Sequence, residues 1–305
     1  MQAVHETFAA AMTPAEYPFT VSVVIPAYNE AHGIAQVLAA VRAYLPHAEL
    51  VVVDDHSADD TAAEARVAGA RVVRRPLNMG NGAAVKTGIR AATSDVVLLM
   101  DADGQMDPQY IPLLLDKLAE GYDMVVGARS AATKGGTQVR RVGNHALDAV
   151  GSYLVEKPVY DLTSGFRAVR RAVILEFLHL LPNSYSYPTT STLALIQAGY
   201  AVGFVPIISK PRQGGRSGQK VLRNGVRFLL IILRMISLFA PLRVYFPVAV
   251  AMLLLAVLSF LISYFITDPF RFRVPNSAVA LSMGAVVVFM FGLIAEQLAA
   301  LRRRE

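Results

Sequence analysis

Short apolar runs alternate with longer amphipathic stretches through the first two thirds of the chain, and this pattern predicts strands and helices in turn. Strands are expected at residues 20–26, 49–53, 71–75, 96–100, 123–126 and 202–206. Helices are expected at 31–44 and 189–198, from the 78–82 glycine loop to 92, and from 167 to about 180, and two more are expected to begin at 57 and 108. We expect Asn29 to cap the first helix. The alternation predicts an α/β fold whose mostly parallel sheet is covered on both faces.

The apolar strand at 96–100 runs directly into two carboxylates, Asp101 and Asp103. A continuous apolar run this short is typical of a strand buried on both faces, and open α/β sheets bind their ligands where such strands end. Carboxylates one residue apart can converge on a hard divalent cation, which bridges phosphates well. A strand end followed by an Asx turn is the alternative, since Asp and Gly also favour turns.

The last third of the chain has a different pattern, with two long spans that carry no charge. They cover 21 residues at 246–266 and 20 residues at 276–295. Each is long enough to cross a bilayer as a helix, whereas two buried core helices would seldom be so long and so uniformly apolar. Small residues four apart in both spans suit close helix packing, within one chain or between the copies of a homo-oligomer.

An apolar stretch before these spans carries its arginines on one helical face. Arg223, Arg227 and Arg234 are spaced by four and seven residues. This predicts an amphipathic helix in the membrane interface rather than a surface helix packed on its own domain. The predicted organisation is therefore an N-terminal extension at 1–19, a catalytic domain at 20–218, a juxtamembrane helix at 219–242 and a two-helix transmembrane hairpin at 243–305.

Composition and charge agree with a membrane protein. Hydrophobic residues make up 54% of the 305 residues, charged residues 17%, and cysteine is absent, which excludes disulfides and thiolate chemistry. The net charge of +6 arises from residues 205–305, which carry 13 basic and 3 acidic side chains. Basic residues are not interleaved with aromatic ones, so we expect no nucleic-acid partner. The positive-inside rule places the 267–275 connection outside, and the catalytic domain and both termini in the cytoplasm.

Several short motifs follow one another in a defined order. Pro26-Ala27-Tyr28-Asn29-Glu30 follows the first strand, Asp54-Asp55 ends the second, the 78–82 glycine loop opens a helix, and Asp101-Ala102-Asp103 ends the fourth strand. In this order the chain closely resembles the family 2 glycosyltransferases of the GT-A fold. Within them it looks most like the polyprenyl-phosphate glycosyltransferases, the group of dolichol-phosphate mannose synthase. The resemblance covers about residues 21–236, and the membrane hairpin also occurs in that group.

The resemblance implies roles for individual residues. A nucleotide-sugar would be bound by Pro26, Ala27, Tyr28, Glu30, Asp54, Asp55, Asp101, Ala102, Asp103 and Arg212. A Mg²⁺ or Mn²⁺ ion would be held by Asp101, Asp103 and Gln105, and the acceptor phosphate by Arg129, Arg141 and Ser217. Asp101, Asp103 and Arg212 would stabilise the leaving diphosphate and are the expected catalytic residues. The chain departs from the family pattern at His56, where glycine is frequent, and at Asn81, where lysine is frequent.

Many family 2 enzymes carry a catalytic carboxylate near the start of the helix after the Gly-Phe-Arg segment. Residues 184–191 of this chain contain none. A hydroxyl acceptor needs a base, whereas a phosphate monoester has a second pKa near 6 and is already largely a dianion. The missing base therefore favours a lipid-phosphate acceptor. Together with the resemblance, this implies an inverting transfer of one sugar from a UDP- or GDP-sugar to undecaprenyl or dolichyl phosphate at the cytoplasmic membrane face. Asp161 either positions a substrate or caps a local turn.

Two other functions are open at this point. A processive polysaccharide synthase typically has a Gln-x-x-Arg-Trp motif and more membrane spans, but this chain has no tryptophan. A non-catalytic membrane subunit with a degenerate transferase domain is the second, and the intact Glu30, Asp101, Asp103 and Arg212 argue against it. The sugar itself does not follow from the sequence.

Overall fold

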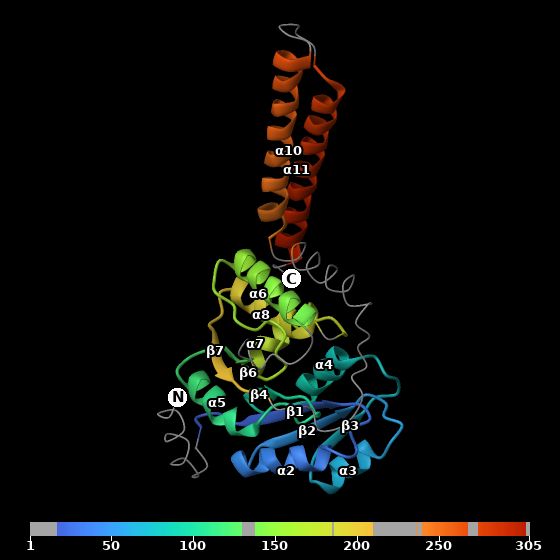
Figure 1. Ribbon diagram of the computed structural model, residues 1–305. Coiled ribbons are helices and arrows are strands. Elements are labelled where there is room, and N and C mark those ends of the chain that lie inside the picture. The colour runs from blue at the N-terminus through green and yellow to red at the C-terminus, as the bar shows by residue number, and fades with distance from the viewer. Residues whose placement is uncertain are drawn as a thin grey trace. The chain divides into compact units, whose positions relative to one another are not determined.

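The computed structural model describes residues 17–129, 138–184, 186–209, 236, 240–267 and 274–302. The chain divides into two units, which Figure 1 shows in ribbon form. The first comprises residues 1–149 and 158–220, and the second comprises 150–157 and 221–305.

The first unit is built on a seven-stranded sheet with the strand order β3-β2-β1-β4-β6-β5-β7. The strands are β1 (Val21–Ala27), β2 (Glu49–Asp54), β3 (Arg71–Arg74), β4 (Val96–Leu99), β5 (Met124–Arg129), β6 (Arg167–Arg170) and β7 (Val202–Ile207). Only β6 runs antiparallel to its neighbours, β4 and β5, among these strands. The predicted α/β fold with a mostly parallel sheet is confirmed.

Helices cover both faces of this sheet (Figure 1). Helices α2 (Ile34–Tyr44), α3 (Thr61–Val67) and α5 (Ile111–Ala119) pack on one face, and α4 (Asn81–Ala91), α7 (Arg171–Glu176) and α8 (Tyr187–Gln197) on the other. The short turn η2 (Pro108–Tyr110) precedes α5. Alternate residues of β4 enter the two cores, Val96 and Leu98 on one side and Val97 and Leu99 on the other. Each such buried side chain contributes roughly 1.5–3 kcal/mol of apolar burial, so β4 is held rigidly up to its last residue.

Two local predictions were wrong. The helix expected from 167 to about 180 begins only at α7, because Arg167–Arg170 instead forms β6 and fills the space between β4 and β5. Asn29 does not cap α2, whose N-cap is Gly33. Asn29 has a left-handed φ of 55°, and its amide oxygen accepts the Ala58 N–H at 2.8 Å. It therefore joins the loops after β1 and β2 instead.

The N-terminus of α4 is covered by the backbone of residues 182–184. The Ala83 N–H donates to the Asn183 carbonyl at 3.1 Å. A Cβ on Gly82 would lie 2.5 Å from the Ser184 carbonyl oxygen and closer still to that of Pro182. Gly82 is thus required because the two backbone segments approach so closely. The Ala83 N–H, which could have bound a phosphate at the helix N-terminus, already has a protein partner.

Replacing Gly82 with alanine should destabilise the protein by about 1–3 kcal/mol, because backbone atoms have to move to admit the methyl group. The expected observable is a lower thermal unfolding temperature of the full-length protein in detergent. Alanine is the better helix former by roughly 1 kcal/mol. A raised unfolding temperature would therefore show that the 182–184 backbone does not crowd this position.

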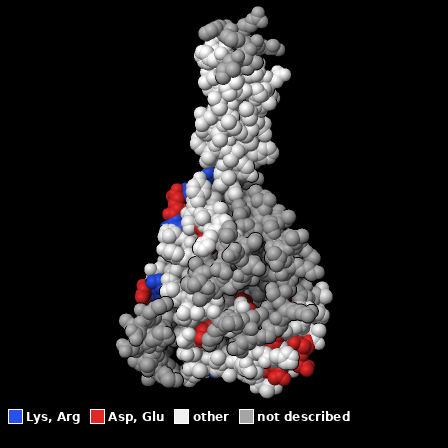
Figure 2. Space-filling model, viewed as in Figure 1, with Lys and Arg blue, Asp and Glu red and all other residues white. Residues whose placement is uncertain are grey.

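The second unit contains a hairpin of two long helices, α10 (Pro241–Ile262) and α11 (Asn276–Arg302), with a π-helical turn, η4 (Ser263–Thr267), after the first. In the most apolar windows of the two helices, only 11% and 17% of the residues are buried. Figure 2 shows the described part of the hairpin as a column of uncharged side chains. Buried core helices of a soluble domain would be covered, so both helices have the length and the exposed apolar surface of membrane spans.

Small residues line the contact between the two hairpin helices. Ala249, Ala256, Ala278 and Ala285 are buried, and a Cβ on Gly284 would meet the terminal methyl of Met252. The Ser259 and Ser277 hydroxyls are hydrogen-bonded at 2.7 Å. Part of the predicted small-residue pattern is therefore used within one chain, as expected for close packing in a bilayer.

Arg243, in the first turn of α10, is fixed by the end of α6 (Gln138–Val155) inside the same unit. Its guanidinium donates to the Tyr153 carbonyl at 2.9 Å and to the Glu156 carboxylate, while the Tyr153 hydroxyl donates to the Arg243 carbonyl at 3.0 Å. A cation at a helix C-terminus is favoured by the helix dipole. The predicted juxtamembrane helix at 219–242 lies almost entirely outside the described residues.

Candidate active site

The sheet has a topological switch point between β1 and β4. From β1 the chain passes to β2 and β3 on one side, and β4 lies on the other side of β1. Open α/β sheets bind ligands in the crevice outside the carboxyl ends of strands at such a point. The motifs that follow β1, β2 and β4 therefore meet at one edge of the sheet, where Ala27 is paired with Asp54.

The end of β1 and the segment after it combine buried and exposed residues. Pro26 and Ala27 are buried, whereas 49% of the Tyr28 side chain is exposed, which leaves its ring free to cover a ligand. The Glu30 N–H donates to Thr61 Oγ1 at 2.9 Å, and the Asn29 N–H to Ser57 Oγ at the same distance. Hydroxyl acceptors at the start of α3 and in the turn before it thus fix the course of this loop.

Both carboxylates at the end of β2 are buried and engaged. Asp54 Oδ1 accepts the Ser57 N–H at 2.9 Å, and its Oδ2 lies 3.2 Å from Arg74 Nε. Asp55 accepts the Met79 and Gly80 N–H groups at 3.2 and 2.8 Å and pairs with Arg75 at 3.1 Å. Asp55 therefore holds the glycine loop in place. The contact of either residue with a base or ribose stays a prediction.

His56 follows this pair with a left-handed φ of 67°. Glycine adopts this conformation without steric cost, which gives a physical reason for its frequency in the family at this position. Histidine is among the side chains that tolerate left-handed backbone best.

Asp101 follows β4 after one intervening residue, Met100, and its carboxylate has a perturbed pKa. Burial and then the charge of Asp103 raise its pKa to about 6, while Asn81, Arg129 and Arg167 act in the opposite direction. Among the described residues, the one hydrogen bond to its carboxylate comes from Asn81 Nδ2 at 3.4 Å. The site thus holds a carboxylate whose ionised form is unfavourable despite the two nearby arginines, and further positive charge would stabilise it.

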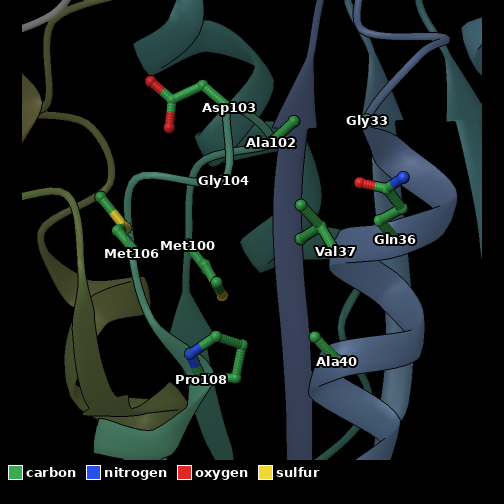
Figure 3. Close-up of a pocket in the computed structure, with 10 residues that line it drawn as sticks. All are labelled: Gly33, Gln36, Val37, Ala40, Met100, Ala102, Asp103, Gly104, Met106 and Pro108. Atoms are coloured by element: carbon green, nitrogen blue, oxygen red, sulfur yellow. The ribbon is translucent and has the colours of Figure 1, made fainter. Parts of the chain in front are cut away.

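Asp103 lies in the turn after Asp101. Its Oδ1 accepts the Gln105 N–H at 3.1 Å, so the predicted Asx turn is present alongside the candidate metal site. Figure 3 shows a mostly apolar pocket between α2 and the 100–108 segment, lined on one side by Gln36 and Val37 and on the other by Met100 and Met106. The Asp103 carboxylate points away from this pocket.

The donor set fits a divalent cation. The charge of Asp103 disfavours the ionised form of Asp101, and a cation bound between the two carboxylates would reverse this effect. Carboxylate oxygens together with the neutral amide of Gln105 are hard ligands of the kind that Mg²⁺ and Mn²⁺ prefer. The ligand assignment itself stays a prediction.

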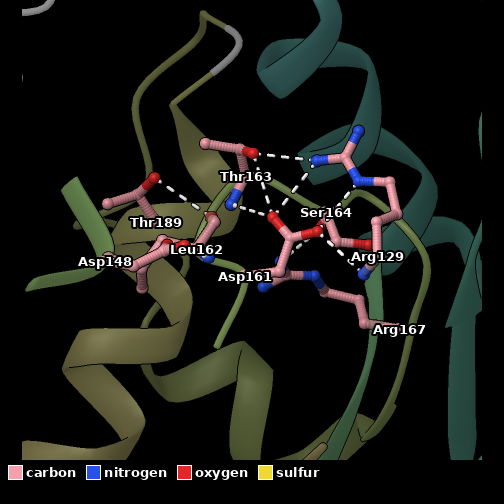
Figure 4. A network of polar contacts seen from close by, with 8 residues as sticks. All are labelled: Arg129, Asp148, Asp161, Leu162, Thr163, Ser164, Arg167 and Thr189. Carbon is pink, nitrogen blue, oxygen red and sulfur yellow. Dashed lines mark hydrogen bonds and ion pairs between the residues drawn. The ribbon is translucent and has the colours of Figure 1, made fainter. Parts of the chain in front are cut away.

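Arg129, the last residue of β5, forms a buried ion pair with Asp161 (Figure 4). Its Nε and Nη2 donate to the two carboxylate oxygens at 2.8 and 3.1 Å, and Nη2 also donates to Thr163 Oγ1 at 2.8 Å. Burial lowers the pKa of Arg129, but the hydrogen bonds and charge of Asp161 outweigh this and raise it. Nη1 has no partner among the described residues and 23% of the side chain is exposed, so a phosphate oxygen can still bind there.

Asp161 closes a local turn, one of the two roles left open by the sequence, and it also fixes Arg129; its contact with a substrate stays a prediction. It accepts the Thr163 N–H and hydroxyl at 3.1 and 3.0 Å, which closes a local turn, and it fixes the Arg129 guanidinium. With its oxygens occupied in this way, it is a positioning residue rather than a free base.

Arg167 is a second buried cation beside the site. Its guanidinium donates to the Pro188 carbonyl, Ser191 Oγ and Thr192 Oγ1 at 2.7–3.2 Å, and it also bonds the Ser164 carbonyl. Burial lowers the pKa of Arg167 to about 10, which still leaves it charged at neutral pH. Hydroxyl and carbonyl oxygens therefore surround a fixed positive charge at the start of α8, where many family members have a carboxylate.

Sequence analysis missed two neighbours of Asp101. Asn81 and Tyr187 begin α4 and α8, and a Cβ on Gly165 would lie 3.0 Å from Asp101 Oδ2 and 3.3 Å from the Tyr187 hydroxyl. Burial and the charge of Asp101 raise the pKa of Tyr187, so it remains a hydrogen-bond donor.

Arg212 and Ser217 lie outside the described residues. Arg141 falls within α6, but its side chain also lies outside them.

Comparison with known proteins agrees with this geometry. Residues 22–178 match the glycosyl transferase family 2, and residues 240–301 match the GtrB C-terminal hairpin. The dolichyl-phosphate hexose transferase of Haloferax volcanii is 35% identical over 205 residues, which cover 65% of this chain and 87% of that protein. The polyprenol monophosphomannose synthase of Mycolicibacterium smegmatis is 31% identical over 212 residues, covering 64% and 79%.

A solved structure is similar as well. The glucosyl-3-phosphoglycerate synthase of Mycobacterium tuberculosis, in complex with Mn²⁺, UDP and glucosyl-3-phosphoglycerate, is 26% identical with a TM-score of 0.57, over 72% of this chain and 80% of that one. The chain therefore belongs to glycosyl transferase family 2 and is a glycosyltransferase with a C-terminal hairpin of two apolar helices. The family resemblance read from the sequence is confirmed.

Proposed function

We propose that the protein transfers a single sugar, with inversion, from a nucleotide-sugar to a polyprenyl phosphate at the cytoplasmic membrane face. Support comes from the two relatives named above, whose names specify dolichyl phosphate and a polyprenol monophosphate product, and from the hairpin that would hold the enzyme at its lipid substrate. The Mn²⁺ and UDP of the solved relative support a divalent ion and a nucleoside diphosphate as leaving group.

The observation that carries the choice of acceptor is the engagement of Asp161. The start of α8 has no carboxylate, and Asp161 is bound to Arg129 and Thr163. An acceptor that arrives as a phosphate dianion needs no base, and Arg129 offers it a guanidinium edge. Arg141 and Ser217 would complete this phosphate site.

Asp101, Asp103 and Gln105 would hold the cation, which would neutralise the diphosphate as the glycosidic bond breaks. The residues that follow β1 and β2 would orient the base and ribose, with Tyr28 covering them. Arg212 would add a second charge at the leaving group. The buried Arg167 contributes a fixed positive potential from behind the site, because its hydrogen bonds prevent it from turning toward solvent.

The test is an assay of purified full-length protein in nanodiscs with Mn²⁺ or Mg²⁺, labelled UDP- and GDP-sugars, and polyprenyl phosphate. We expect label in the lipid fraction with one nucleotide class, and loss of that label with EDTA. The unphosphorylated polyprenol is the matched control acceptor and should remain unlabelled.

Three outcomes contradict the proposal. A folded, nucleotide-binding protein that labels no lipid with any donor would exclude the polyprenyl-phosphate acceptor. Label in a soluble phosphorylated acceptor such as 3-phosphoglycerate would indicate the acceptor class of the solved relative instead. A long polymer product would indicate a processive synthase.

A further inference from the structure

Asn81 is placed beside the candidate metal carboxylate with one half of its side-chain amide unused. Its Nδ2 donates to Asp101 Oδ1 at 3.4 Å. Because an ionised carboxylate only accepts hydrogen bonds, the amide nitrogen has to face Asp101 and the amide oxygen faces away. Asn81 Oδ1 is buried and has no hydrogen-bond partner in the part of the chain that the structure describes.

The fold of α4 gives no structural reason for this amide. The Ala83 N–H donates to the carbonyls of Gly80 and Asn183, and the Ala84 N–H donates to Gly80, all through backbone atoms. The Asn81 side chain is therefore not needed to cap the helix. A buried acceptor without a donor is unfavourable, so its presence at a ligand site indicates that a donor arrives with the ligand.

We propose that Asn81 is a ligand-binding residue of the transferase site. Its amide nitrogen holds the Asp101 carboxylate, and its oxygen accepts a hydrogen bond from an O–H group of the bound donor complex. That group is either a water on the divalent cation or a hydroxyl of the sugar to be transferred. The proposal rests on the function proposed above and adds a contact that a lysine at this position could not make, since lysine has no acceptor atom.

The neutral amide also has an electrostatic consequence. A lysine beside Asp101 would pair with the carboxylate and partly replace the cation, whereas an amide leaves the full carboxylate charge to the metal. In this chain, tight donor binding should therefore depend strongly on the divalent ion.

The test is calorimetric titration of full-length protein with Mn²⁺ plus UDP, UDP-sugars, GDP or GDP-sugars. Asn81→Ala, which has neither donor nor acceptor, should bind the nucleotide that the wild type prefers about tenfold more weakly. Asn78→Ala, an exposed position in the same loop, is the matched control and should bind as the wild type does.

The two sources of the O–H group give different results. Water on the cation predicts equal losses with the nucleoside diphosphate and with the nucleotide-sugar. A sugar hydroxyl predicts a larger loss with the nucleotide-sugar. Either pattern supports the proposal if the ligand-free Asn81→Ala protein unfolds at or above the unfolding temperature of the wild type. We expect this result because the substitution removes a buried oxygen that has no hydrogen-bond donor.

Equal binding by Asn81→Ala and wild type, for both kinds of ligand, would overturn the inference while leaving the proposed function intact. A lower unfolding temperature of ligand-free Asn81→Ala would also overturn it, because the amide would then be structural. If the wild type binds neither UDP nor GDP with Mn²⁺, the proposed function fails and the inference fails with it.

Discussion

Asp101→Asn should abolish sugar transfer and, at the same time, raise the unfolding temperature of the metal-free protein. The carboxylate is enclosed beside Asp103, and burial raises its pKa to about 6. At neutral pH the metal-free fold therefore holds an ionised group in an unfavourable place. Asparagine has nearly the same shape without the charge, but it is a far weaker ligand for a divalent ion.

The sign of the pH dependence follows from the direction of the shift. The unfolded chain releases this proton near the ordinary value of 3.8 and the native state only near 6. The cost of the ionised group is thus absent below about pH 4 and fully present above about pH 6. Raising the pKa from 3.8 to about 6 corresponds to at most about 3 kcal/mol, or at most roughly 6–12 °C for a domain of about 200 residues.

The measurement is thermal unfolding of full-length protein from pH 4 to 8, with and without Mn²⁺ and nucleotide. The stabilisation by Asp101→Asn should shrink as the pH falls toward 4. Mn²⁺ with nucleotide should raise the unfolding temperature of the wild type but not that of Asp101→Asn. Asp60→Asn is the control, since this exposed carboxylate at the N-cap of α3 makes no capping hydrogen bond. A metal-free variant less stable than the wild type at pH 7, or one that transfers sugar at the normal rate, would contradict the assignment.

Asp161→Asn should be the most destabilising single substitution in the site. The carboxylate is fully buried and accepts hydrogen bonds from the Arg129 N–H, Nε and Nη2 and from Thr163. Removing one partner of a buried ion pair leaves the other charge without compensation and costs about 3–5 kcal/mol. The unfolding temperature should fall by roughly 10 °C, and transfer should be lost because Arg129 is no longer held in place.

A double-mutant cycle separates the ion pair from simple loss of packing. Arg129→Met removes the charge that Asp161→Asn leaves unpaired, so the double variant should be more stable than the sum of the two single losses predicts. Glu120→Gln breaks an exposed pair with Lys117 at 3.9 Å and should change stability by less than about 1 kcal/mol. Additive losses in the cycle would show that the two side chains act independently.

The sheet and the strand-end motifs could be predicted because their signals are local. The apolar run of β4 followed by Asp101, and the acidic pair after β2, are contiguous in sequence. β6 could not be predicted, because it is only four residues long and its Arg-Ala-Val-Arg sequence continues directly into α7. Its strand character comes from the two neighbours that pair with it.

The internal partners of the site residues could not be predicted for a related reason. Arg129 and Asp161 are 32 residues apart, and Asn81 and Asp101 are 20 apart. Nothing in the spacing of these residues indicates that they pair, because their contact depends on the order of strands in the sheet. Asn81 did have one signal, its departure from the family's lysine, but the meaning of that departure required the position of Asp101.

The backbone bond between Ala83 and Asn183 has a consequence for how the enzyme moves. It joins the part of the catalytic domain that contains Asp101 to the part that contains Arg129. Two further hydrogen bonds cross the same boundary: Lys86 Nζ donates to the Leu181 carbonyl at 3.0 Å, and the Arg171 N–H donates to the Asp95 carbonyl at 2.8 Å. Hinge motion needs a boundary that few contacts cross. β4 also pairs directly with β6 across this boundary. We therefore expect the two parts to move as one body, so that substrates enter and products leave without the catalytic domain opening into two lobes.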